Sequence, residues 1–131
     1  MVWIWNSVVA SVSKNLLIVF LGALLGSVLR LVSEGGVRWV LATEPAYNLL
    51  VVNAVGCAAF GYCAVVIRSQ QAKLFWLTGC WGAYTSFSAV SLVFLLMGLS
   101  LSQVCFYTAL TAFSWGMSFD VGQRLGRIAR S

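Results

Sequence analysis

The longest uncharged stretch of the chain runs from residue 74 to residue 119 and reads LFWLTGCWGAYTSFSAVSLVFLLMGLSLSQVCFYTALTAFSWGMSF. A membrane-spanning helix needs roughly 20 mainly apolar residues, so this stretch is too long for one such helix and suits two. Glycine and serine interrupt the apolar pattern at 97–100, which is the expected position of a tight turn. The stretch therefore predicts spans at about 74–97 and 101–122.

Two shorter uncharged runs nearer the N-terminus suit spans at about 15–32 and 47–67. Residues 1–14 lack the basic leading segment of a signal peptide and are expected to form an interfacial lead-in. Trp3 and Trp5 are expected at the depth of the lipid headgroups.

The composition supports a lipid environment. Hydrophobic residues make up 61% of the chain and charged residues 8%, whereas a soluble domain carries about 25% charged residues. A soluble enzyme and a disordered segment are therefore excluded, and the scattered basic residues form no stripe for nucleic acid. We expect one domain over 1–131, an all-α integral membrane protein with four transmembrane helices per subunit.

Basic residues divide unevenly between the two sides that four spans define. The side with both termini and the second loop would hold Lys14, Arg68, Lys73, Arg124, Arg127 and Arg130. The opposite side would hold only Arg30 and Arg38. This count predicts that both termini lie in the cytoplasm.

Asp, Glu, Lys and His are missing from the middle of every predicted span. Proton-coupled transporters usually place such a group there, which argues against a small multidrug antiporter. Without histidine or a carboxylate at depth, no nucleophile–base pair can form, so we expect no enzyme. The cysteines lack metal-ligand spacing and are interpreted as small buried packing residues: Cys57, Cys63, Cys80 and Cys105.

Neutral polar residues do enter the spans. Asn53 in the second span must either form a helix–helix hydrogen bond or face water. The third span reads Gly79-Cys-Trp-Gly-Ala-Tyr-Thr-Ser-Phe-Ser88, and its glycines and hydroxyls are typical of either a helix break or close helix packing. One face of the fourth span carries a stripe that is either a polar track or a hydroxyl seam: Tyr107, Thr111, Ser114 and Ser118.

Amides, hydroxyls and aromatic ring edges all present partial positive charge without a full charge. A row of such groups can replace the hydration shell of a small anion and still release it, as conduction requires. The residues fit a passive anion pathway better than a pump, and they leave the anion unnamed.

Three segments together resemble the CrcB/Fluc fluoride channels. They are Gly22-Ala-Leu-Leu-Gly-Ser-Val-Leu-Arg30, Asn48-Leu-Leu-Val-Val-Asn-Ala-Val-Gly56 with the Phe60-Gly61 that follows, and the 79–88 segment. The order, spacing and chain length match as well.

This resemblance implies an antiparallel, dual-topology dimer in the cell inner membrane that exports fluoride passively and lowers its toxicity. A sodium ion would sit at the dimer interface, held by backbone carbonyls at Gly82 and Thr85. The fluoride pathway would include Asn53, Phe87, Ser88, Tyr107 and Thr111, with an electrostatic or structural role for Arg30.

Two departures from the family pattern stand out. Val90 occupies the position of a second phenylalanine, so ring-edge contacts are expected to depend on Phe87 alone. The uneven Lys/Arg count suits a heterodimer with an oppositely oriented homologous chain as an alternative to a homodimer. The alternative functions are a non-conducting membrane assembly subunit and a small multidrug-type transporter.

Overall fold

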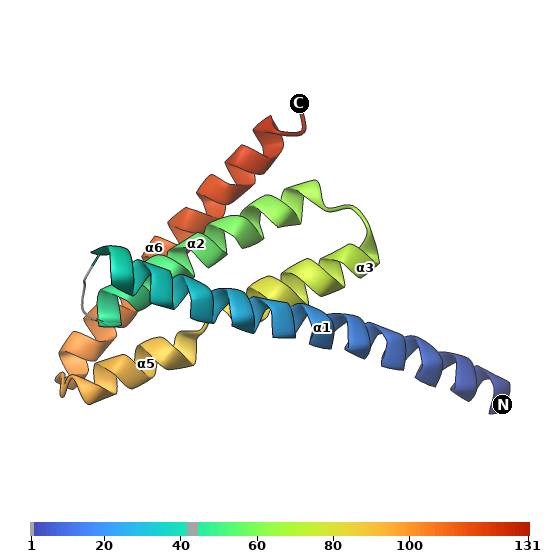
Figure 1. Cartoon of the computed structure of the whole chain (residues 1–131), viewed down its shortest axis with the longest axis horizontal. Helices are drawn as coiled ribbons and strands as arrows, with labels where there is room; N and C mark the ends of the chain where they lie inside the picture. Colours follow the sequence, from blue (N-terminus) through green and yellow to red (C-terminus); the bar gives the residue numbers. More distant parts are fainter. Residues whose placement is uncertain (1, 42–44) are drawn as a thin grey trace.

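The computed structural model describes the backbone of residues 2–41 and 45–131 and the side chains of residues 9–40 and 47–131. These residues form helices and short connections and contain no strand, which confirms the all-α class (Figure 1). In chain order the elements are α1 (Val2–Leu41), α2 (Pro45–Val66), α3 (Gln70–Lys73), the π-helix η1 (Leu74–Trp81), α4 (Gly82–Tyr84), α5 (Phe87–Leu96) and α6 (Leu101–Ile128).

Helix α1 is longer than the sequence predicted. The described part of the expected lead-in and the expected first loop as far as Leu41 belong to one continuous helix from Val2 to Leu41. Charged residues end an apolar run without ending a helix, and the ion pair of Arg30 with Glu34 at i,i+4 spacing suits helical structure. The prediction for Trp3 and Trp5 falls on side chains outside the described ones.

Residues 74–119 follow the prediction closely. Helices η1, α4 and α5 occupy the third predicted span, with α3 directly before it, and the chain breaks between α4 and α5. The turn after α5 contains Gly98 at φ 65°, a conformation that glycine adopts without a steric penalty. At the start of α6, the Ser100 N–H donates to Gln103 Oε1 at 2.9 Å. The break and the turn are both confirmed, whereas the π-helix was not foreseen.

Three helical stretches in the described residues are long and apolar enough to cross a membrane: Val9–Val40, Tyr47–Val66 and Gln70–Leu96. Helix α6 has 28 residues, but polar side chains such as Gln103 and Asp120 lower its apolar content. The fourth predicted helix is therefore observed, and its crossing of the membrane stays a prediction.

Two pairs of helices approach so closely that only glycine fits at the contact. A Cβ on Gly22 or Gly26 of α1 would collide with backbone oxygens of η1, and one on Gly79 would lie 2.6 Å from the Val19 carbonyl. Small residues four positions apart, such as Gly22 and Gly26, permit this close approach of two helices. A Cβ on Gly122 of α6 would collide with α2 in the same way, a contact that the sequence analysis did not identify.

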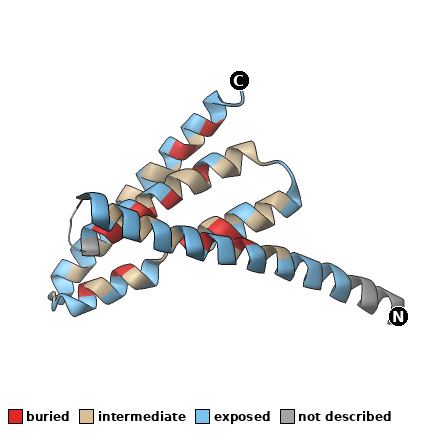
Figure 2. Ribbon diagram, in the orientation of Figure 1, coloured by how far each residue is buried: buried red, intermediate tan, exposed pale blue. Residues whose placement is uncertain are grey.

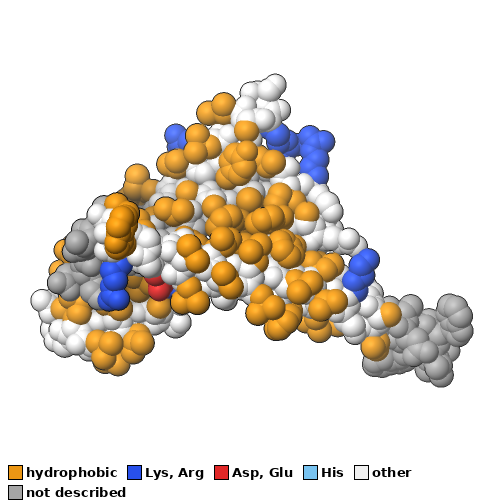
Figure 3. All heavy atoms as spheres, viewed as in Figure 1, with side chains coloured by type: hydrophobic (Ala, Val, Ile, Leu, Met, Phe, Trp, Pro, Cys, Tyr) orange, Lys and Arg blue, Asp and Glu red, His pale blue; other side chains and the backbone are white. Residues whose placement is uncertain are grey.

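Burial is confined to the crossings of the helices (Figure 2). Hydrophobic side chains cover the face seen in Figure 3, and Lys and Arg side chains lie at its margins. Large apolar residues such as Leu31 and Trp39, 70% and 86% exposed, have no cover within the subunit. Such a surface is suited to lipid or to a second subunit, as expected for a membrane protein.

The cysteines follow the packing prediction in part. All four are free thiols; Cys80 is buried, while Cys57 and Cys63 are partly buried. Cys63 accepts a hydrogen bond from the Trp81 indole N–H at 3.3 Å between α2 and η1. The prediction was wrong for Cys105, which is exposed because it lies on the outer side of α6 near its start.

Candidate functional site

The candidate site is the interruption between α4 and α5. Thr85 (φ −87°, ψ 141°) and Ser86 (φ −145°, ψ 114°) are extended, so the helix stops at Tyr84 and restarts at Phe87. The Ser86 hydroxyl caps α5 by accepting a hydrogen bond from the Ala89 N–H at 3.2 Å. Thr85 and Ser86 therefore lie where helical hydrogen bonding is interrupted, and the Ser88 hydroxyl lies in the first turn of α5.

Asn53 fixes the interruption from α2. Its side-chain Oδ1 accepts from the Ser86 N–H at 2.9 Å, and its Nδ2 donates to the Ser86 carbonyl at 3.4 Å. The residue is completely buried in the subunit. The amide thus satisfies backbone groups that the helix break released, which is the helix–helix hydrogen bond left open by the sequence.

Arg30 reaches the same break from α1. Its Nη1 donates to the Tyr84 carbonyl at 2.7 Å, and its Nε pairs with Glu34 at 2.7 Å. The remaining nitrogen, Nη2, is buried and has no hydrogen-bond partner in the described part of the chain. The guanidinium therefore brings a positive charge and one unused donor to the break.

The diverted hydrogen bonds release two particular carbonyls. In an unbroken helix the N–H of Ser86 would bond to the Gly82 carbonyl, and the N–H of Ala89 would bond to the Thr85 carbonyl. Here those donors go to Asn53 and to the Ser86 hydroxyl instead. Gly82 and Thr85 therefore present carbonyl oxygens that lack their usual helical donors.

Phe87 and Ser88 begin α5 on the surface of the subunit. The Phe87 side chain is 49% exposed, and Ser88 is also exposed. The Ser88 hydroxyl lies 3.0 Å from the Ser86 hydroxyl. Phe87 makes an edge-to-face contact with Trp115 of α6, with ring centroids 6.0 Å apart and an interplanar angle of 85°. Trp115 was not identified from the sequence.

The stripe on α6 lies farther along the same side of α5. Tyr107 and Thr111 line a cavity of about 660 Å³ together with Val90 and Phe94. Thr111 is almost completely buried and Tyr107 is 42% exposed, with its ring 5.8 Å from that of Phe94. The Ser118 hydroxyl donates to the Ser114 carbonyl within the helix, so it is not free for another group.

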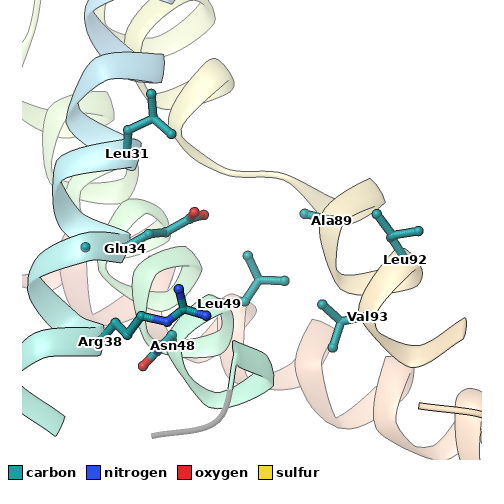
Figure 4. Close-up of a pocket in the computed structure, with 9 residues that line it drawn as sticks. Leu31, Glu34, Arg38, Asn48, Leu49, Ala89, Leu92 and Val93 are labelled. Carbon is teal, nitrogen blue, oxygen red and sulfur yellow. The ribbon is translucent and has the colours of Figure 1, made fainter. Parts of the chain in front are cut away.

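A second cavity, of about 420 Å³, opens between α1, α2 and α5 (Figure 4). Glu34 and Arg38 extend toward it from α1, and Asn48 lies beside Arg38 at the start of α2. Leu49 and Val93 supply apolar walls. Neither of these two cavities is lined by Asn53. Asn53, Phe87 and Ser88 therefore lie at the break, whereas Tyr107 and Thr111 line the larger cavity.

This arrangement defines a class: a multi-pass helical membrane protein with a polar interruption in one membrane-capable helix. The family model described as CrcB-like protein, Camphor Resistance (CrcB), matches residues 17–122, and the chain belongs to that family.

Curated relatives agree with this assignment. A "Fluoride-specific ion channel FluC" of Haemophilus ducreyi is 36% identical over 84 residues, covering 59% of this chain and 61% of the relative. One of Mesorhizobium japonicum is 33% identical, covering 61% and 68%. A "Fluoride-specific ion channel FluC 2" of Mycobacterium bovis is 41% identical over 64 residues, covering 49% and 51%. The chain thus spans about three fifths of the length of the first of these relatives. No solved structure gave a significant match.

Proposed function

We propose that this protein is a fluoride-selective channel that lets fluoride leave the cytoplasm passively across the cell inner membrane. The observation that carries the proposal is the broken helix held by Asn53 in a chain whose family relatives are named fluoride-specific ion channels. The break collects neutral donors, as an anion pathway requires if the ion is to leave again.

Charge distribution supports an anion. Arg30 is the cation closest to the break, and it holds the Tyr84 carbonyl while one of its N–H groups stays unused. Its charge is partly balanced by Glu34, so it can raise the local anion concentration without forming a tight ion pair in the passage. Phe87 and Ser88 then offer a ring edge and a hydroxyl on the exposed side of the break.

The second subunit in this proposal covers the break. Irregular backbone at membrane depth is tolerated only where protein or water covers it. Gly82 and Ser88 are exposed in the single subunit, so a partner surface would need to cover them. We propose an antiparallel dimer, either of two identical chains or with an oppositely oriented homologous chain, whose contact includes this face.

The residues at the break also fit a structural sodium ion. Sodium is a hard cation that takes oxygen ligands, and the Gly82 and Thr85 carbonyls have both lost their helical donors. Two subunits would contribute two such pairs at a shared interface. The ion would supply positive charge that stabilises the facing helix ends of the two subunits.

A second candidate is a non-conducting assembly subunit in the membrane. It is favoured by one observation, the double hydrogen bond of Asn53 to Ser86, which can serve helix packing alone. A small multidrug-type transporter is less well supported, because the Glu34 carboxylate on α1 is already paired with Arg30.

Growth of a bacterial strain without its own fluoride exporters tests the proposal. Cells that express the wild-type chain should grow at fluoride concentrations that stop cells with the empty vector, while chloride at the same concentrations makes no difference. If both strains stop at the same fluoride concentration although the protein is present in the membrane, the proposed function is wrong.

A further inference from the structure

Trp115 on α6 stands out because its indole N–H has no partner. Its Nε1 atom and Arg30 Nη2 are the two buried side-chain nitrogen or oxygen atoms in the described part of the chain without a hydrogen bond. Buried donors in folded proteins nearly always find a partner, so an orphan of this kind calls for an explanation.

The position of Trp115 relates it to the broken helix. Its ring meets Phe87 edge to face at 6.0 Å. It also packs against the buried cluster of Leu49, Val90 and Phe94. The indole therefore lies between the one phenylalanine of the break and the cluster that contains Val90, which is smaller than phenylalanine.

Trp115 also continues the stripe of α6. Tyr107, Thr111 and Trp115 are spaced four residues apart and lie along one side of the helix. Ser114 and Ser118 follow on the same helix, but the Ser118 hydroxyl is used within the backbone. Among the α6 side chains, the Trp115 indole both contacts Phe87 and carries a buried N–H without a partner in the described residues.

We propose that Trp115 is a pathway residue of this channel, in which its ring is the second aromatic beside Phe87 and its N–H donates to fluoride. This inference rests on the proposed function. An indole N–H is a donor without a formal charge, so it can bind a dehydrated anion and release it. The Trp115 ring would then supply the second aromatic group that Val90, at the position of the family's second phenylalanine, does not provide.

Two measurements on the purified, full-length protein test the inference. The first is fluoride efflux from liposomes for Trp115→Phe, which keeps an aromatic ring and removes the N–H. Loss of a hydrogen bond to a charged group should raise the fluoride concentration at half-maximal flux by about tenfold or more. Trp39→Phe is the matched control, because Trp39 is 86% exposed on α1, and it should behave like the wild type.

The second measurement does not require a Trp115 variant that assembles. The indole N–H signals of the wild-type protein in micelles are recorded by two-dimensional proton–nitrogen NMR. The other five tryptophans are replaced one at a time, and the signal that none of these replacements removes belongs to Trp115. Addition of sodium fluoride, but not of sodium chloride, should shift the Trp115 signal, and the Trp39 signal should stay in place. A purely structural tryptophan would give no such shift.

The outcomes separate the two claims. The inference is overturned, and the proposed function stands, if the wild type and Trp115→Phe conduct fluoride equally well and the Trp115 indole signal of the wild type does not shift with fluoride. If the wild type carries no fluoride, the proposed function fails and this inference fails with it. If Trp115→Phe does not assemble, the indole signal of the wild type decides.

Discussion

The side-chain amide of Asn53 and the backbone of Ser86 are joined at two points, by Oδ1 to N–H at 2.9 Å and by Nδ2 to C=O at 3.4 Å. A residue of α2 thereby replaces the helical partners that the chain between α4 and α5 has lost. The break is thus fixed by a contact between segments distant in the sequence, and the donors and carbonyls around it have defined positions.

Replacement of Asn53 tests that relationship. Asn53→Leu removes both hydrogen bonds and leaves the half-buried Ser86 N–H without its side-chain acceptor. We expect a loss of about 1–3 kcal/mol in stability and a strong reduction of fluoride flux from the assembled protein. Thermal unfolding in detergent and efflux from liposomes measure the two effects.

Thr78→Val is the matched control, since it exchanges a polar for an apolar side chain at an exposed position of η1. It should change neither quantity. If Asn53→Leu dissociates the oligomer while the remaining dimers conduct at the wild-type rate, the non-conducting role of Asn53 as a packing residue is favoured.

The seam between α2 and α6 gives a second prediction. A Cβ at Gly122 would collide with the Ala58 carbonyl, whereas a Cβ at Gly116 would meet nothing within 4 Å. Gly122→Ala should therefore force the helices apart and cost about 1–3 kcal/mol. Gly116→Ala on the same helix should be neutral or stabilise by up to about 1 kcal/mol. Melting temperatures in one detergent compare the pair, and equal losses for both would contradict the observed seam.

Arg30 and Glu34 should respond unequally to substitution. Arg30→Gln leaves the Tyr84 carbonyl at the break without its 2.7 Å donor, and we expect a loss of about 1–3 kcal/mol. Glu34→Gln removes a partly exposed i,i+4 ion pair and should cost less than about 1 kcal/mol. Chemical unfolding of the two variants is the measurement. A Glu34 effect as large as the Arg30 effect would show that the ion pair, and not the carbonyl contact, stabilises the break.

Sodium exchange tests the carbonyls of Gly82 and Thr85. An ion that binds only the folded dimer stabilises it by mass action. Replacing sodium with N-methyl-D-glucamine, which is too large for a carbonyl site, should increase the monomer fraction on size-exclusion chromatography. Readdition of sodium should reverse the change, and a dimer fraction indifferent to sodium would exclude a structural ion.

Much of this architecture could be predicted because membrane helices have simple requirements. The local sequence was sufficient for three features of this region: the helices within the uncharged run 74–119, the turn at Gly98 and the break in the hydroxyl-rich 79–88 segment. The end of α1 could not be predicted from the positions of charged residues, because a charged residue can end the membrane-embedded part of a helix while the helix itself continues.

Contacts between segments that are distant in the sequence could not be predicted either. Nothing near Arg30 in the chain identifies the Tyr84 carbonyl as its partner, because that bond depends on how α1 crosses the broken helix. Trp115 was not predicted as a site residue for a similar reason. A tryptophan among apolar residues cannot be distinguished from a packing residue until its neighbours are known. The pathway roles of Asn53, Phe87 and Ser88 stay predictions.

Fluoride efflux from liposomes reconstituted with the wild-type protein tests the proposed fluoride channel itself. Liposomes loaded with equal concentrations of fluoride and chloride are diluted into a medium with neither ion, and ion-selective electrodes follow both. The account predicts rapid release of fluoride with chloride retained. Release of both ions at similar rates, or of neither above protein-free liposomes, would contradict it.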